Sequence, residues 1–209
     1  TRCPPRRAAR WPTSPTAPEP RFDFAIPAPP AGHKIGSVVH QARAAETRRE
    51  ILDAAVALFS EHGYGGTNLN QIIRRAHVTH GAFYYHFASK EEVAFAIIDQ
   101  VAEGTAALRA AFVGTPASGL ANVIEMTFQL GVLLGRNQSY WVAAYLEHTM
   151  ARHSPKGSQE AAERIEAFVA DVAQAVRPAE LRDGLAAEDA ARTMVSVIYG
   201  SLWMGGLLN

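Results

Sequence analysis

The sequence predicts an all-α fold of one or two domains. From about residue 44 onward, apolar residues recur every three or four positions, which is the period of an amphipathic helix. Glycine, proline and asparagine interrupt this pattern where helices should end. No segment alternates apolar and polar residues as a strand would. With 48% hydrophobic residues among 209, the chain can bury a core of this kind.

The first 40 residues differ from the rest in composition. They hold nine of the twelve prolines and several arginines, with no hydrophobic period. Such a segment is predicted to be disordered or partly polyproline II. The chain therefore divides into a tail (residues 1–40) and a helical part (residues 41–209).

The first predicted helix runs from about Ala44 to Gly63. The run Thr47-Arg48-Arg49-Glu50 has the form of a capping box, although the helix could begin one turn earlier. Glycine adopts positive φ without strain, so Gly63 is the expected end. The apolar positions between these points share one face and are Ile51, Leu52, Ala55, Leu58 and Phe59.

Two short helices separated by a tight turn come next. Thr67 is predicted to cap the first, and Thr79 the second, which runs from about His80 to Phe87. His77 lies in the turn between them. The second of these helices is too polar and aromatic on its outer side for a core element, and it begins with small groups that can approach another surface closely. The pattern indicates a helix that reads DNA.

The remaining sequence predicts five further helices. Ser89-Lys90-Glu91-Glu92 is a capping box, and it opens a long helix that ends near Gly114. The uncharged stretch Thr193–Asn209 is short for a bilayer span and contains three glycines, so we expect a buried helix and no membrane partner. The helices after the long one are predicted at about Ser118–Gly135, Ser139–His153, Gln159–Val176 and Glu188–Leu208.

Charge is divided unevenly along the chain. Residues 1–90 hold twelve Lys/Arg and six Asp/Glu, whereas residues 91–209 hold eight and fourteen. A basic first half is expected of a surface that neutralises phosphates. Residues 1–43 supply most of the excess, so a basic tail and chance asymmetry are the alternative explanation. The single cysteine, Cys3, cannot form an internal disulfide, and a cytoplasmic setting is favoured.

The run from Thr47 to Val93, TRREILDAAVALFSEHGYGGTNLNQIIRRAHVTHGAFYYHFASKEEV, closely resembles the N-terminal domain of the TetR family of transcriptional regulators. Aromatic, glycine and capping positions are all in register. The resemblance implies a three-helix helix-turn-helix DNA-binding domain, completed by the start of a fourth helix. It places that DNA-binding domain at residues 41–90 and implies that residues 91–209 form a larger helical domain, which binds an effector and dimerises. The implied partners are double-stranded DNA with a palindromic operator, a small-molecule effector and a second copy of the chain.

The expected DNA contacts lie on and around the third helix. Its N-terminal end offers free N–H groups and a positive partial charge, which favour a phosphate. Phe83 and Phe87 should point inward and hold the helix. Capping alone is the alternative role for Thr67 and Thr79, and partial burial for the outward tyrosines and His86. Lys90 resembles the family's phosphate anchor. The predicted DNA-binding residues are Thr67, Thr79, His80, Gly81, Tyr84, Tyr85, His86 and Lys90.

Two positions depart from the family pattern. The family commonly has glycine in the turn at the position of His77, so a strained positive φ is expected there. It commonly has Lys or Arg at the position of His80, which near neutral pH would carry only part of a charge. Both changes bear on DNA affinity and sequence preference, and neither on the fold.

The second domain is predicted to bind a small apolar effector in a pocket closed by a few polar groups. Ordinary core packing is the alternative for each candidate taken singly. The segments HFASKEEVAFAI, MTFQLGVLL and ARTMVSVIYGSLWMGG resemble the γ-butyrolactone receptor subgroup, which favours a butyrolactone-like ligand. The pocket tryptophan usual in that subgroup, on the helix corresponding to residues 159–176, is missing. The predicted ligand-binding residues are Met126, Phe128, Gln129, Trp141, Tyr145, Tyr199 and Trp203.

The resemblance implies a dimer in which the last two helices form a four-helix bundle. Family members usually continue with another helix beyond a segment such as Thr193–Asn209, so this chain is expected to be shortened within its interface. A dimer would bring two recognition helices to successive major grooves.

These observations predict a DNA-binding transcriptional regulator that a small molecule releases from its operator, with repression as the family default and activation left open. An effector-independent or architectural DNA-binding protein is one alternative. A helical enzyme is another, but Glu147, His148 and His153 lack the HExxH spacing, and no glycine-rich phosphate loop follows a strand. No catalytic residue, metal site or cofactor is predicted.

Overall fold

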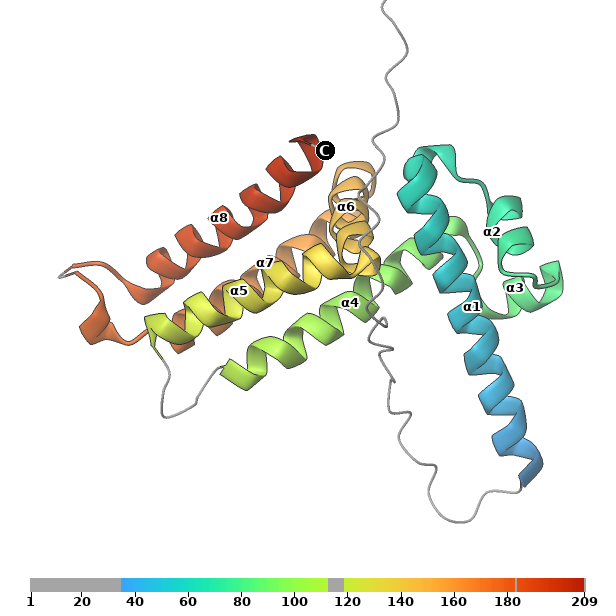
Figure 1. Cartoon of the computed structure of the whole chain (residues 1–209), viewed down its shortest axis with the longest axis horizontal. Coiled ribbons are helices and arrows are strands. Elements are labelled where there is room, and N and C mark those ends of the chain that lie inside the picture. The colour runs from blue at the N-terminus through green and yellow to red at the C-terminus, as the bar shows by residue number, and fades with distance from the viewer. Residues whose placement is uncertain (1–34, 113–118, 183, 209) are drawn as a thin grey trace, which may run out of the picture.

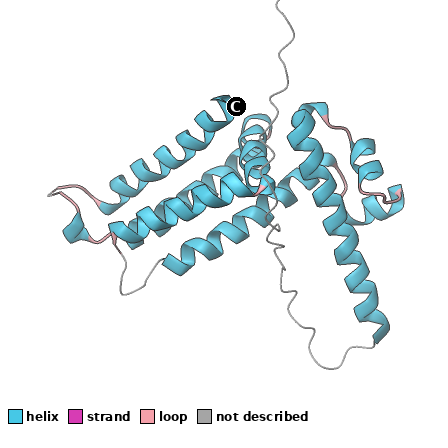
Figure 2. Ribbon diagram, in the orientation of Figure 1, coloured by secondary structure: helices cyan, strands magenta, loops and turns pink. Residues whose placement is uncertain are grey.

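The computed structural model describes the backbone of residues 35–112, 119–182 and 184–208, and the side chains of residues 40–112, 119–133, 137–177, 179–182 and 184–200. Regular structure in these ranges is helical throughout, as predicted (Figures 1 and 2). The helices are α1 (Ile35–Gly66), α2 (Leu69–Arg75), α3 (His80–His86), α4 (Lys90–Phe112), α5 (Leu120–Arg136), α6 (Gln138–His153), α7 (Pro155–Ala175) and α8 (Ala187–Leu208), with a 3-10 turn at Pro178–Glu180.

The first helix begins earlier than the sequence pattern placed it. α1 starts at Ile35 rather than near Ala44, so residues 35–40 are helical and do not belong to a disordered tail. Thr47 therefore lies inside α1, and its predicted capping box is not used. The physical reason is that no proline follows Pro30 before α1 ends. The rest of the predicted tail, residues 1–34, lies outside the described residues.

Gly63 ends the regular part of α1, as expected. Its backbone has φ 68° and ψ 171°, which is non-helical and falls in the region that glycine tolerates best. The chain then turns through Tyr64 to Thr67 and enters α2.

Two hydrophobic cores lie at opposite ends of α4. The N-terminal core joins α1, α2, α3 and the first turns of α4, and it centres on Ile51, Phe59, Ile72, Phe83 and Val93. The C-terminal core joins α5, α7 and α8, with Leu108 and Phe112 of α4 packed against it. Figure 1 shows α4 running from the α1–α3 group toward α5 and α7.

α6 contributes to the N-terminal core although it lies far along the sequence. Val142, Leu146 and Met150 are all buried at 2% exposure or less in that cluster. The first three helices therefore do not enclose their core alone, and α6 completes it.

α6 meets α7 at a sharp corner. Ser154 caps α7 by accepting the N–H of Gly157, so α7 begins at Pro155, one turn before the predicted start at Gln159. Proline is tolerated there because the first turn of a helix needs no N–H donor. In the described part of the chain, no helix combines the length and the apolar character that crossing a membrane requires.

Candidate nucleic-acid interface and ligand cavity

α2 is capped by Asn68 and not by Thr67 as predicted. The Asn68 side chain accepts the N–H of Gln71 at 3.0 Å, while the Gln71 side chain accepts the N–H of Asn68 at 2.7 Å. This reciprocal pair satisfies two N–H groups that the helix itself leaves without acceptors.

Thr67 is buried, with 1% of its surface exposed. Its hydroxyl faces the carbonyl oxygens of Leu58 at 3.2 Å and Gly63 at 2.9 Å, and its single hydrogen is shared between them. A side chain enclosed in this way does not reach a phosphate, so the predicted contact of Thr67 with DNA is wrong. Its role is to hold the link between α1 and α2 (residues 64–68) against the C-terminal end of the regular part of α1.

The turn between α2 and α3 has the geometry expected of it. His77 has φ 55°, which confirms the positive value expected where the family commonly has glycine. The turn is held by backbone hydrogen bonds from His77 N–H to Arg74 O (3.2 Å) and from Val78 N–H to Ile73 O (3.3 Å). The strained residue is thus fixed by bonds on both sides of it.

α3 is anchored on one face and open on the other. Thr79 caps it by accepting the N–H of Ala82 at 3.1 Å, as predicted. Phe83 is fully buried and Phe87 is 2% exposed, so two rings four positions apart hold the helix on the N-terminal core. The outer face presents Tyr84 at 55% exposure and Tyr85 at 78%, together with exposed Thr79, His80 and Gly81.

His86 is less open than these neighbours. Its ring lies edge-on to that of Tyr85, with centroids 4.9 Å apart, and the residue is half-buried. Burial lowers the pKa of His86, and the nearby charge of Arg48 lowers it further. His86 is therefore a neutral donor or acceptor near pH 7 and adds no positive charge to the surface.

Arg48 is a neighbour that the sequence pattern did not identify. Its guanidinium carbon lies 5.2 Å from the centroid of the Phe87 ring, which places a cation from α1 beside the end of α3. No local signal connects two positions so far apart in the chain, since only the packing of α1 on α3 brings them together.

Lys90 binds the protein itself. Its ammonium donates to the carbonyl oxygens of Tyr64 and Thr67, both at 2.7 Å, and lies 4.1 Å from the centroid of the Tyr64 ring. Burial lowers the pKa of Lys90. Two of its three N–H groups are thus committed to tying the start of α4 to the α1–α2 link, and only the third is left for the expected phosphate contact.

A cavity of about 120 Å³ lies between α4, α5, α6, α7 and α8. Its lining is mainly apolar, with Ile98, Leu130 and Phe168 among the side chains. The polar groups that face it are Thr105, Arg109, Tyr140, Glu147, Arg164 and Tyr199.

Of the seven predicted ligand-binding residues, Tyr199 alone lines this cavity in the described structure. Met126 is 1% exposed within the C-terminal core, and Phe128 points outward at 65% exposure. Gln129 donates to Glu125 of its own helix at 2.7 Å. The side chain of Trp203 lies outside the described residues.

Trp141 and Tyr145 occupy a different place from the one predicted. Their rings stack with centroids 6.0 Å apart, and the Tyr145 hydroxyl accepts the N–H of Tyr64 at 3.4 Å. This face of α6 therefore meets the α1–α2 link, while the face with Tyr140, Ala143 and Glu147 meets the cavity. The sequence showed that α6 is rich in aromatic residues. It did not show which face of α6 packs on the α1–α2 link and which face lines the cavity.

Both arginines at the cavity are paired with polar neighbours. Arg109 donates to Asp171 at 2.7 Å and to Thr105 at 3.4 Å, and its guanidinium lies 5.0 Å from the Phe168 ring centroid. Arg164 donates to Glu147 at 2.8 Å. Burial, followed by the negative charge of Glu147, raises the pKa of Tyr199 to about 12. Tyr199 is therefore a neutral hydrogen-bond donor at physiological pH.

Comparison with known proteins gives a consistent result for the first domain. Residues 51–97 match the sequence profile described as bacterial regulatory proteins of the tetR family. The A-factor receptor protein of Streptomyces griseus is 53% identical over 60 residues, which are 29% of this chain and 22% of that protein. The match thus spans less than a quarter of that relative's length.

Solved structures match over most of the chain. The crystal structure of a γ-butyrolactone receptor (ArpA-like protein) aligns with a TM-score of 0.63 and 28% identity, covering 76% of this chain and 83% of that one. The TetR family protein CprB from Streptomyces coelicolor, in complex with its biological operator sequence, aligns with a TM-score of 0.59 and 30% identity. That alignment covers 73% of this chain and 76% of CprB.

Proposed function

This chain belongs to the TetR family of bacterial regulatory proteins, and from that premise we propose that it is a sequence-specific, DNA-binding transcriptional regulator of the cytoplasm. The family is one of regulators rather than enzymes. We propose further that the protein is a homodimeric repressor. It dissociates from a palindromic operator when a small molecule binds in the cavity lined by α4, α5, α6, α7 and α8.

The outer face of α3 carries the DNA-binding proposal. Tyr84 and Tyr85 expose hydroxyl donors on stiff side chains, and Gly81 leaves an open approach to the backbone. Because Phe83 and Phe87 fix α3 from behind, these groups are preorganised for a groove rather than ordered on binding. The proposed contacts are Thr79, His80, Gly81, Tyr84, Tyr85, His86 and the third N–H of Lys90.

The test begins with selection of duplexes from random-sequence DNA by the full-length protein, followed by fluorescence anisotropy on the selected duplex. Tyr85→Ala should weaken binding about tenfold, which corresponds to ~1.4 kcal/mol. Phe128→Ala is the matched control, since Phe128 is comparably exposed (65%) but lies on α5. Equal affinity of the Tyr85 variant and the wild type, with the same dependence on salt, would show that α3 is not the reading helix.

The cavity supports a small, mostly apolar ligand with a polar group. Cavities near 150 Å³ hold a molecule about the size of benzene, so about 120 Å³ suits a lactone ring better than a ring with a long chain. A longer ligand would have to part the helices, and a ligand shifts an equilibrium only if it binds one conformation better. We favour a butyrolactone-like ligand on this basis and on the likeness to a γ-butyrolactone receptor.

The ligand proposal is tested with γ-octalactone, a butyrolactone ring carrying a short alkyl chain. It should raise the melting temperature of the protein and lower its affinity for the selected duplex. Tyr199→Phe, which removes one hydroxyl and keeps the ring, should weaken both effects. If no lactone stabilises the protein or releases DNA, an effector-independent DNA-binding protein becomes the better description.

A further inference from the structure

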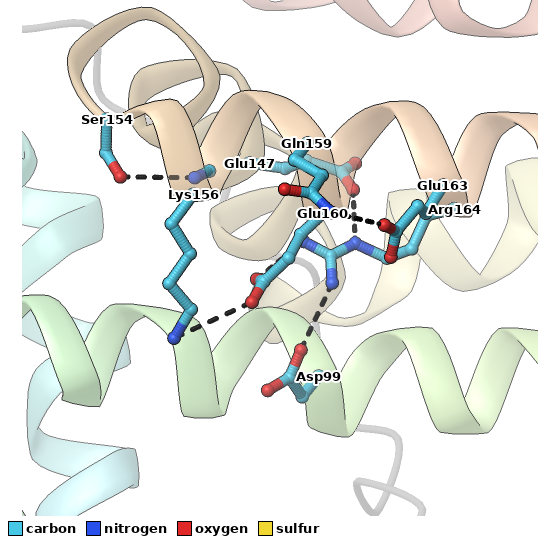
Figure 3. A network of polar contacts seen from close by, with 9 residues as sticks. Asp99, Glu147, Ser154, Lys156, Gln159, Glu160, Glu163 and Arg164 are labelled. Atoms are coloured by element: carbon cyan, nitrogen blue, oxygen red, sulfur yellow. Dashed lines mark hydrogen bonds and ion pairs between the residues drawn. The ribbon is translucent and has the colours of Figure 1, made fainter.

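Arg164 joins three helices through one guanidinium group (Figure 3). From α7, its Nε donates to Glu147 of α6 at 2.8 Å, and its Nη1 donates to Asp99 of α4 at 3.2 Å. Its Nη2 lies 3.7 Å from Glu160 of its own helix, and Lys156 lies 3.6 Å from the other oxygen of Glu160. Two cations, Arg164 and Lys156, thus form ion pairs with three carboxylates, which belong to Glu147, Asp99 and Glu160.

The members of this network differ in depth. The Glu147 side chain is 15% exposed and that of Arg164 is 22% exposed, whereas Asp99 is 57% exposed. Glu147 and Arg164 both line the cavity, and Asp99 is not among the described residues that do. Arg164 therefore has one partner at the cavity wall and another on the outer side of α4.

α4 links Asp99 directly to the DNA-binding domain. Lys90 begins the same helix nine positions earlier, roughly 13 Å along the axis at 1.5 Å per residue. Its ammonium holds the carbonyl oxygens of Tyr64 and Thr67, immediately before α2. A shift of α4 at Asp99 is therefore carried by a continuous helix to the link that positions α2 and α3.

We propose that Arg164 couples the cavity to the DNA-binding domain by dividing its hydrogen bonds between Glu147 and Asp99. A ligand that bonds to Glu147 or to Arg164 at the cavity wall changes how firmly the guanidinium holds Asp99, and with it α4. The inference rests on the proposed function, because it assumes a ligand in this cavity. Arg164 is a positioning residue, since it acts on DNA only through α4.

The first test is amide hydrogen exchange of the full chain without DNA or ligand. Asp99→Asn removes the charge that Arg164 holds on α4, and exchange should rise about threefold or more in residues 64–69 and 90–99. Glu166→Gln is the control, because it breaks a pair with Arg192 (2.7 Å) between α7 and α8 that does not touch α4. Unchanged exchange in those two segments, or an equal rise in every helix, would overturn the proposal.

The second test measures the affinity of the protein for the selected duplex with and without γ-octalactone. Asp99→Asn should weaken DNA binding severalfold and keep the affinity for the lactone, but the lactone should no longer lower DNA affinity. Arg164→Lys should give an intermediate result, since the single nitrogen of lysine lacks the fixed, planar set of donors with which the guanidinium reaches two carboxylates on different helices. If the wild type binds no DNA, the proposed function fails while the exchange result still decides the coupling. If the lactone releases DNA equally from Asp99→Asn and the wild type, the coupling is wrong and the function stands.

Discussion

Lys90 makes three contacts within the protein, two hydrogen bonds and one contact with an aromatic ring. Its ammonium donates to the carbonyl oxygens of Tyr64 and Thr67, and the Tyr64 oxygen also accepts the N–H of Thr67 at 3.4 Å. It also lies over the Tyr64 ring, and burial raises the pKa of that tyrosine. The residue therefore ties the start of α4 to the α1–α2 link before it is part of any DNA surface.

Replacing Lys90 should cost stability as well as DNA affinity. We expect Lys90→Met to lower the free energy of unfolding by about 1–2 kcal/mol, because a charged donor to two carbonyls is lost. Urea denaturation at neutral pH measures this. Lys156→Met is the matched control, since the Lys156 side chain is 66% exposed, and it should cost less than about 0.5 kcal/mol. Equal losses of unfolding free energy in the two variants would contradict the role of Lys90 in tying α4 to the α1–α2 link.

His86 should make stability depend on pH. Its pKa in the folded protein lies below the ordinary value of 6.5, through burial and then the charge of Arg48. Between the folded and unfolded pKa values the unfolded chain binds the extra proton, so stability rises with pH in that window and is lost as pH falls through 6.5.

The expected result is a flatter pH profile for His86→Gln than for the wild type across this window, measured by urea denaturation at a series of pH values. Arg48→Gln should make this fall smaller, because removing that charge lets the folded pKa of His86 rise toward its ordinary value and narrows the window. Parallel profiles for the wild type and His86→Gln would mean that another group causes the dependence.

Thr67 and Asn68 illustrate what the sequence could and could not predict at the scale of single residues. Either residue type can cap a helix, so a cap near this point was predictable. The choice between neighbours depends on the backbone of Gly63, whose conformation turns Thr67 toward the carbonyls of α1. That information lies in the packed structure rather than in the local pattern.

Among the helices, those bounded by strong signals were predicted well. α3 was predictable from Thr79 and the two inward phenylalanines, and α6 from its length and period. The start of α1 was not, because Gly36 and Ser37 have weak helix propensity and the segment directly follows the proline-rich residues, whereas helix continues into it from the rest of α1. The lining of the cavity was not predictable either, since it depends on how α6 is rotated between two neighbours.

The close approach of α6 and α7 at their corner requires glycine at position 157. A Cβ on Gly157 would lie 2.5 Å from the carbonyl oxygen of Met150, and backbone cannot easily move away. We expect Gly157→Ala to cost roughly 2 kcal/mol or more, within the range for overpacking. Gly131→Ala is the control, because a Cβ there meets nothing within 4 Å.

In the control, alanine should stabilise α5 by about 0.5–1 kcal/mol through its higher helix propensity. Thermal unfolding followed by circular dichroism measures both variants. A Gly157 variant as stable as the wild type would mean that the corner opens at little cost and that α7 is free to shift relative to α6.

For the whole molecule, the shared core makes the two domains interdependent. Leu146 of α6 is fully buried in the N-terminal core. We expect Leu146→Ala to lower the free energy of unfolding by about 3 kcal/mol, as large-to-small changes in cores do. Leu185→Ala, at a position 47% exposed in a loop, should cost much less.

The loss of stability in Leu146→Ala should affect the whole molecule, so that both cores unfold in a single transition. Trp141 packs against the N-terminal core, so in a background where Trp11 and Trp203 are replaced by Phe its fluorescence reports on that region, while far-ultraviolet circular dichroism reports on all helices. We expect the two signals to change at one temperature, lower than in the wild type. Two separate transitions would show that the cores unfold independently.

The completion of the N-terminal core by α6 limits how this protein can be recombined with its relatives. A hybrid regulator built by grafting residues 41–90 onto another effector domain would lose the side chains of Val142, Leu146 and Met150 that fill the base of that core. The exchangeable unit is therefore discontinuous in sequence and includes one face of α6. Grafts that carry this face along should express as folded protein, and grafts cut at residue 90 should need compensating substitutions on α6.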